Sequence, residues 1–208
     1  MAKKYELTQN SVTVKNSTLY QIRALRGFGS VTAGDLGGYI ESEKNLSHDN
    51  DCWVYENARV FGDAHVFGNS GVYGNARVSG DAQVFGNARV YGNAYVSGDA
   101  CVFEDAHVYG KAWVSGNARV YGDALVYGDA WVYGGAQVYG YAQIYGNALV
   151  YRQAHVSGDA RLGYVPVDFD CDFDPYESVM KIFNHKEILP VLLGIDLGLN
   201  KMISEKLK

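Results

Sequence analysis

The sequence predicts an all-β solenoid of about six triangular coils, and three observations lead to that class. First, an aliphatic residue recurs at every sixth position from Val54 to Leu162 without a slip. Second, the intervals follow the pattern Val-x-Gly-Asn/Asp-Ala-x, in which Gly followed by Asn or Asp is typical of a tight turn. Third, no insertion interrupts this register between positions 54 and 163. A six-residue period matches neither a helix nor a flat strand, but it matches one side of a triangular coil.

Each side of the triangle is expected to be one short strand followed by a corner. In a segment such as Ala76-Arg77-Val78-Ser79, alternation points Ala and Val inward and the residues that flank Val outward. Glycine tolerates positive φ at the corner that follows. Three sides make an 18-residue coil, and coils stacked at about 4.8 Å give a prism roughly 29 Å long.

The motif Val120-Tyr121-Gly122-Asp123-Ala124-Leu125 resembles the hexapeptide-repeat family, the left-handed parallel β-helix proteins. The left-handed winding is what this resemblance implies. Glycine stands one place later here than is common in the family. Relatives include CoA-dependent acyltransferases, metal-dependent carbonic anhydrases and non-catalytic scaffolds, so the fold alone selects no function.

Residues 1–53 lack the six-residue period and are expected to form an N-terminal cap over the open edge of the first coil. Strand signals on either side of Lys15-Asn16-Ser17 predict a hairpin. The glycine-rich run from Gly34 to Glu41 is interpreted as turns and not as a phosphate cradle, because it lacks the G-x-x-x-x-G-K-[ST] spacing and no helix pattern follows. The runs 19–25, 34–43 and 52–55 resemble the head of bacterial and phage-encoded hexapeptide-repeat proteins that are labelled transferases or left uncharacterised. That resemblance implies a mobile-element origin and a host protein as target, but no reaction.

Aromatic residues fall into columns when positions are compared one coil apart. Tyrosine follows the aliphatic residue on the third side in six consecutive coils, and Tyr95, Trp113 and Trp131 precede it on the first side, beside serines. One interpretation is self-stacking along the solenoid, and the other is a contact surface for a partner. The predicted contact residues are Tyr55, Tyr73, Tyr91, Tyr109, Tyr127, Tyr145, Tyr95, Trp113 and Trp131, together with Leu193 and Leu197 of the C-terminal tail.

No catalytic residue is predicted. The resemblance implies that a transferase would place a His base in a cleft between subunits beside an extruded loop, but no loop breaks the register. His65, His107 and His155 fall on two different sides, so they are expected to be solvated, and His107 is the candidate if the chain is a transferase. The family's carbonic anhydrases carry a pair of His within one coil, which is missing here, so neither a metal site nor a cofactor is expected.

Composition narrows the class of partner. The net charge of −5 is mild and the repeat is nearly balanced, which argues against a nucleic-acid partner. No apolar run approaches the ~20 residues of a membrane span, and residues 1–6 lack a signal-peptide core, so a cytoplasmic protein without a membrane partner is expected. The three cysteines, Cys52, Cys101 and Cys171, are widely spaced and are expected to be free thiols.

Residues 164–208 leave the period and are expected to form a strand and a helical tail. Apolar and acidic residues alternate from Tyr164 to Asp174, which predicts a half-buried strand whose aspartates form a solvated edge or, alternatively, a Ca²⁺ site. Asp174-Pro175 begins a helix that should run to about His185. The apolar stretch 188–199 either caps the last coil or packs on another chain.

Together these features favour a non-catalytic binding or assembly protein that presents flat aromatic faces to a protein partner or to itself, as a homo-oligomer, either a dimer or a trimer. The alternative is an acyl-CoA-dependent acyltransferase, which rests on the family resemblance.

Overall fold

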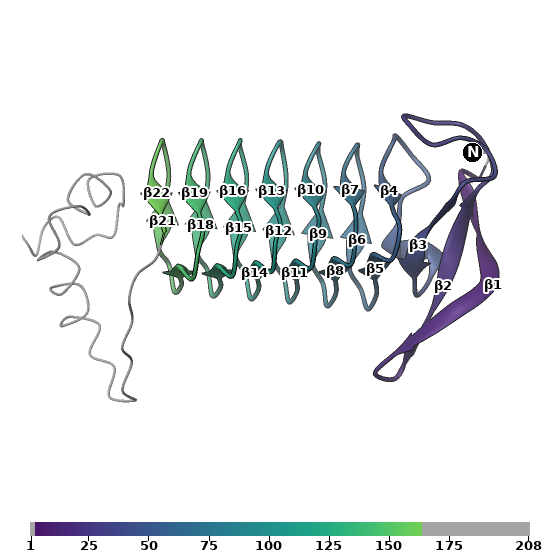
Figure 1. The fold of residues 1–208 in the computed structure, drawn as a ribbon, viewed down its shortest axis with the longest axis horizontal. Coiled ribbons are helices and arrows are strands. Elements are labelled where there is room, and N and C mark those ends of the chain that lie inside the picture. The colour runs from purple at the N-terminus through teal and green to yellow at the C-terminus, as the bar shows by residue number, and fades with distance from the viewer. Residues whose placement is uncertain (1–2, 164–208) are drawn as a thin grey trace, which may run out of the picture.

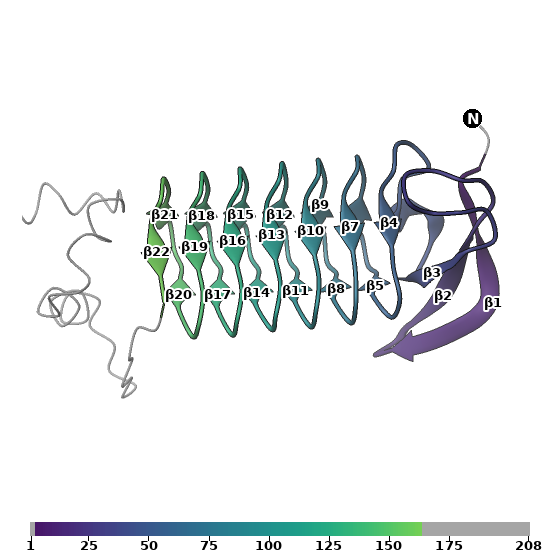
Figure 2. The same ribbon diagram turned by 45° about the horizontal axis from the view of Figure 1, so that its top comes forward.

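The protein is described over residues 3–163 by a computed structural model, and this part of the chain is a parallel β-solenoid with an N-terminal hairpin (Figures 1 and 2). Its strands form three sheets, one on each side of a triangular prism. The predicted fold class is therefore confirmed. The left-handed sense of winding stays a prediction from the family resemblance.

The first side is a nine-stranded sheet. Its strands, in spatial order, are β1 (Tyr5–Val14), β2 (Ser17–Ala24), β3 (Leu36–Ile40), β5 (Arg59–Val60), β8 (Arg77–Val78), β11 (Tyr95–Val96), β14 (Trp113–Val114), β17 (Trp131–Val132) and β20 (Leu149–Val150).

The second side is a six-stranded sheet and the third is a seven-stranded sheet. The second contains β6 (His65–Val66), β9 (Gln83–Val84), β12 (Cys101–Val102), β15 (Arg119–Val120), β18 (Gln137–Val138) and β21 (His155–Val156). The third contains β4 (Trp53–Val54), β7 (Gly71–Val72), β10 (Arg89–Val90), β13 (His107–Val108), β16 (Leu125–Val126), β19 (Gln143–Ile144) and β22 (Arg161–Leu162).

Each repeat strand pairs in parallel with the strand one coil further on. Tyr95 lies opposite Trp113, and Trp113 lies opposite Trp131, so the 18-residue step predicted for one coil is confirmed. The inward Val and Ala side chains fill the prism, and those of Val78, Ala82 and Val84, for example, are completely buried. The residues on either side of each Val face outward, except that Trp53, before Val54, is buried. Their identity is therefore free of the core and can serve a surface function.

The corners show why glycine recurs. Gly86 has φ +69°, and a Cβ placed on it would lie 2.8 Å from the backbone N of Glu104 in the next coil. Both the left-handed conformation and the close stacking of coils therefore require glycine there. Three corners depart from the pattern, because Glu56, Glu104 and Arg152 take the same positive φ.

One complete coil precedes β5 and ends at Val54, the first residue of the strict six-residue period. Strand β3 pairs in parallel with β5, Leu46 forms a bridge with Val66, and β4 pairs with β7. The inward residues of this coil are Ile40, Leu46 and Val54, all buried. The solenoid thus starts inside the segment that was expected to be only a cap, and β3 adds a strand to the first side before β5.

The interpretation of Gly34–Glu41 as turns is wrong for most of its length, because Leu36–Ile40 is strand β3. The glycines of this strand are required by packing. A Cβ on Gly37 would lie 2.6 Å from Cγ1 of Ile22, and one on Gly38 would lie 2.5 Å from the carbonyl oxygen of Ala58.

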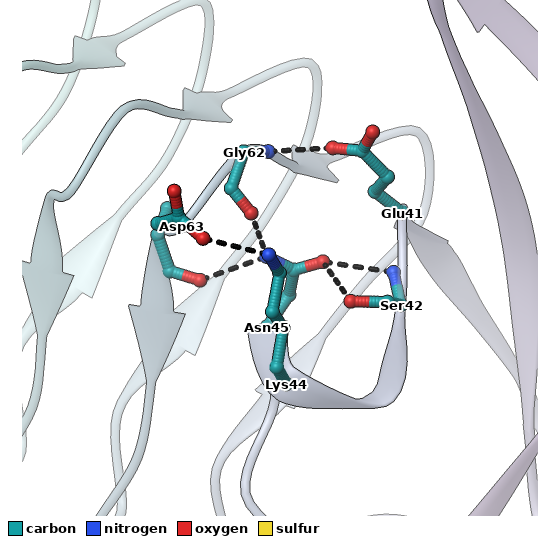
Figure 3. A network of polar contacts seen from close by, with 7 residues as sticks. Glu41, Ser42, Lys44, Asn45, Gly62 and Asp63 are labelled. Carbon is teal, nitrogen blue, oxygen red and sulfur yellow. Dashed lines mark hydrogen bonds and ion pairs between the residues drawn. The ribbon is translucent and has the colours of Figure 1, made fainter.

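A buried asparagine joins the first coil to the repeat (Figure 3). Asn45, in the 3₁₀ turn η1 (Glu43–Asn45), is fully buried and donates from Nδ2 to the carbonyl oxygens of Gly62 and Ala64, both at 2.9 Å. Its Oδ1 accepts from the backbone N–H of Ser42 at 2.9 Å. Every group of this amide is therefore paired, as a buried polar side chain requires.

The predicted hairpin is confirmed. Strands β1 and β2 pair antiparallel, and the turn that joins them contains Lys15 with φ 54°. The register of the pair is irregular between Leu7 and Ser11. The hairpin arm, β1 and β2 with their turn, projects beyond the prism beside β5 (Figures 1 and 2). The strand predicted over 164–174, the helix from Asp174, the third cysteine Cys171 and the apolar stretch 188–199 lie outside the described residues.

Candidate interaction surface

The outer face of the nine-stranded sheet carries the largest exposed aromatic side chains of the repeat. Trp113 and Trp131 keep 37% and 45% of their surface exposed, and their ring centroids lie 4.9 Å apart at 44°. Tyr95 lies 5.1 Å from Trp113, and the guanidinium of Arg77 lies 5.1 Å from the Tyr95 ring centroid. Tryptophan is enriched among the residues that anchor interfaces, so this exposed pair is a candidate contact site.

A second column on the same face runs beside these rings. It starts with Phe61 after β5, continues with the small side chains Ser79, Ser97 and Ser115, and ends with Tyr133 and Tyr151 in the next two coils. The two tyrosine rings stack at 5.5 Å, and Tyr133 is 36% exposed. We call Ser79, Ser97 and Ser115 the serine trough and Tyr133 with Tyr151 the tyrosine ridge. From β8 to β20 the face is therefore uneven, with small side chains after the first three strands and tyrosines after the last two.

The six-tyrosine column of the third side is half-buried and does not form one continuous stack. Tyr55 stacks on Tyr73 at 4.3 Å, while a separate stack joins Tyr91, Tyr109, Tyr127 and Tyr145 at 4.7 to 5.4 Å. No ring contact joins Tyr73 to Tyr91 within the described residues. The reason is Gly71, since a Cβ there would lie 2.4 Å from Oη of Tyr73, so the ring of Tyr73 turns back over the empty position.

The longest continuous stack lies on the second side, where sequence reasoning assigned no site. Five half-buried rings are spaced by 4.8 to 5.0 Å with interplanar angles of 2° to 7°: Phe67, Phe85, Phe103, Tyr121 and Tyr139. The same 18-residue comparison that found the tyrosine column could have found this stack. In both stacks the rings are half-buried and pack against rings of their own column, which fits the self-stacking interpretation. Trp113 and Trp131, in contrast, stay exposed.

The histidines do not converge. His65 and His155 lie on β6 and β21, at opposite ends of the six-stranded sheet, and His107 lies on β13 of another sheet. Burial lowers the pKa of His65, and burial together with the charge of Arg89 lowers the pKa of His107. Within residues 3–163 no carboxylate or backbone group hydrogen-bonds the His107 ring, whose described contact is an edge-on approach to Tyr91 at 5.9 Å. A ring without an orienting partner is poorly prepared to act as a general base.

Sequence reasoning also missed a buried ammonium at the start of β1. The Nζ of Lys4 donates to the carbonyl oxygen of Cys52 at 2.9 Å and lies 3.3 Å from the Sγ of that residue. Burial lowers the pKa of Lys4 and raises the pKa of the Cys52 thiol. Both Cys52 and Cys101 are free thiols. The sequence did not indicate that Lys4 is buried, because the loop that encloses it begins 45 residues further along the chain.

Over residues 3–163, no group of three or more His, Cys, Asp or Glu side chains is arranged to hold a metal ion. In the same part of the chain, no helix has the length and apolar character needed to cross a membrane.

Comparison with known proteins agrees with this architecture. The family model described as YdcK Beta solenoid repeat matches residues 72–84, 82–98, 112–127, 118–134 and 142–158. A curated relative from Escherichia coli (strain K12), named Uncharacterized acetyltransferase YdcK, is 43% identical over 63 residues. Those residues make up 30% of this chain and 19% of the relative, so the match spans about a fifth of the relative's length.

Proposed function

We propose that this parallel β-solenoid, part of which matches the YdcK Beta solenoid repeat model, is a non-catalytic binding or assembly protein. Its contact surface is the outer face of the nine-stranded sheet. The observation that carries the proposal is the exposed pair Trp113 and Trp131 on a regular sheet whose own core does not use them.

The core and the face are independent because of the strand alternation. Val114 and Val132 face inward and are completely buried, while the preceding Trp113 and Trp131 face outward. Removing the outward rings therefore leaves no cavity in the prism. Interface tryptophans that become fully covered typically cost about 2–4 kcal/mol of binding free energy when they are truncated. The two rings are thus worth more in a complex than in the isolated chain.

The test is the double variant W113S/W131S, since serine already occupies the adjacent column at Ser115. Association with the partner should be abolished while the fold survives. The matched control is Tyr141→Ser, which removes a ring that is 65% exposed but lies at a corner outside this face. Thermal melting and analytical ultracentrifugation are measured on the same samples. A lower melting midpoint with unchanged sedimentation and unchanged partner capture would mean that the rings only stack along the solenoid.

A second candidate is an acyl-CoA-dependent acyltransferase, and the specific observation in its favour is the name of the Escherichia coli relative. In that case His107 is the general base, with a cleft completed by another subunit. Loss of a general base usually costs about 10²–10⁴-fold in rate. Acetyl-CoA turnover that collapses in His107→Ala, but persists in His65→Ala and His155→Ala, would replace the first proposal with this one.

A further inference from the structure

We propose that the outer face of the nine-stranded sheet binds a second copy of this chain, packed face to face and antiparallel, with Trp113 on the two-fold axis. The inference rests on the proposed function and names the partner. Five strands of each copy take part, namely β8, β11, β14, β17 and β20.

The argument starts from the shape of the face. Reading one coil at a time, the column after the inward Val contains the serine trough and then the tyrosine ridge. When the two copies are antiparallel and the two-fold axis passes through β14, Tyr133 lies over Ser97 of the second copy and Tyr151 lies over Ser79 of the second copy. Ser115 then faces its own equivalent. The high half of each face thus fills the low half of the other, which is the self-complementarity that a two-fold interface demands.

The neighbouring column supplies the aromatic contacts. The same axis brings Trp113 against its equivalent and Tyr95 against Trp131 of the second copy. Aromatic pairs of this kind contribute beyond the area that they bury, and tryptophans near the centre of an interface dominate its energy. At the rim, Lys111 faces its own equivalent, but each ammonium has Asp129 of its own chain at 3.8 Å, which offsets the repulsion.

The hairpin arm decides between the two ways of packing the faces. It projects past the prism beside β5, at one end of the face (Figures 1 and 2). A parallel arrangement would bring both arms to the same end, in the gap of about 10 Å between packed sheets. An antiparallel arrangement centred on β14 leaves β5 outside the overlap, so that each arm lies beyond β20 of the other copy.

The size of the overlap predicts a weak dimer. Five coils at ~4.8 Å and a side of six residues at ~3.3 Å give about 480 Å² on each copy, or close to 1,000 Å² in total. That value lies at the lower limit for a specific interface, about 1,000 to 1,200 Å². We therefore expect a monomer–dimer equilibrium that depends on protein concentration.

The experiment combines sedimentation with cysteine cross-linking of the full chain, in a background that carries C101S and C171S. Ser115→Cys places one thiol of each copy at the axis, within reach of a short bismaleimide linker across the gap of about 10 Å. Ser79→Cys is the matched control, because its two thiols are displaced by four coil steps, about 19 Å, in the antiparallel dimer. We expect a dimer in sedimentation, covalent dimers from S115C, at least tenfold less from S79C, and neither dimer nor cross-link after W113S/W131S.

Three outcomes would overturn the inference. The first is a monomer at every concentration tested. The second is a dimer in which S79C links as readily as S115C, which indicates parallel packing. The third is a dimer that neither variant cross-links and that W113S/W131S leaves intact, which indicates another surface. If the chain is monomeric but W113S/W131S loses a protein that the natural chain captures, self-association fails and the proposed function stands; if capture is unchanged as well, both fail.

Discussion

Glu104 accepts a hydrogen bond through Oε2 from the backbone N–H of Gly122, one coil away, at 2.8 Å. The same relationship joins Glu56 to Gly74 and Glu41 to Gly62, both at 2.7 Å. Glu56 and Glu104 stand at corners where the repeat otherwise has glycine, and both have positive φ. A carboxylate therefore compensates, by satisfying a backbone donor of the neighbouring coil, for a conformation that disfavours a side chain.

The first prediction separates these two contributions at Glu104. Glu104→Ala removes the hydrogen bond and keeps the positive φ, so it should lower the free energy of unfolding by about 1–2 kcal/mol. Glu104→Gly loses the same bond but relieves the backbone strain, so it should stay within about 0.5 kcal/mol of the natural protein. Urea unfolding of both variants measures the difference. Equal destabilisation in the two would show that the carboxylate, and not the backbone, sets the stability of this corner.

A second prediction compares two corner glycines. Gly86→Ala meets the backbone N of Glu104 at 2.8 Å and φ +69°, whereas Gly158→Ala at φ +63° has no described atom within 4 Å of its Cβ. The first change should cost more than 2 kcal/mol and the second only the conformational cost of about 1–2 kcal/mol. Thermal melting decides the order, and a reversed order would mean that coil stacking does not limit the corners.

The third prediction concerns Asn45. Asn45→Asp should destabilise the protein more than Asn45→Ala, because a buried carboxylate would face the carbonyl oxygens of Gly62 and Ala64 in place of a donor. We expect a loss of about 2–3 kcal/mol for Ala and a larger one for Asp at neutral pH. Acidification should recover part of the Asp loss, since the protonated group can donate one bond. Denaturation at two pH values checks this.

A fourth prediction uses Tyr5, whose hydroxyl is buried and donates to the carbonyl oxygen of Leu46 at 2.7 Å. Burial raises the pKa of Tyr5 above its ordinary value of 10.0, with a smaller contribution from the charge of Glu43. The folded state therefore holds the proton more tightly than the unfolded chain, so this contribution is complete below pH 10.0 and is lost as the pH rises further.

The comparison variant is Tyr5→Phe. It should be less stable than the natural protein at neutral pH by about 1 kcal/mol, yet the stability gap should narrow as the pH rises above 10.0, because Phe does not titrate. The shifts at Lys4 and Cys52 affect both proteins and cancel in the difference. A gap that stays constant over this range would contradict the assigned cause.

The aromatic columns show how far residue spacing reaches. Positions 18 residues apart lie in one sheet and one column. The column from Tyr55 to Tyr145 and the column of Tyr95, Trp113 and Trp131 could therefore be predicted without a structure. Whether neighbouring rings stack could not be read, because it depends on the size of the residue beside them. One glycine, Gly71, is enough to turn Tyr73 away from Tyr91.

The N-terminal region shows the opposite case. Residues 36–54 form a coil, but its three inward residues are six and eight positions apart, with a 3₁₀ turn between them. No fixed period marks such a coil. Buried partners from distant parts of the chain, such as Asn45 with Gly62 or Lys4 with Cys52, replace the regular corners, and a search for periodicity cannot detect them.

By itself the sequence determined the solenoid, its 18-residue coil, the inward Val and Ala, and the column in which each outward side chain stands. These follow from local alternation and corner chemistry, which repeat every six residues and need no distant information. Only the tertiary structure decided which rings stack, which stay exposed, where the first coil begins and how the corner glutamates are satisfied. Those outcomes depend on contacts between side chains one or more coils apart, and such contacts are set by volume and orientation, which residue spacing does not encode.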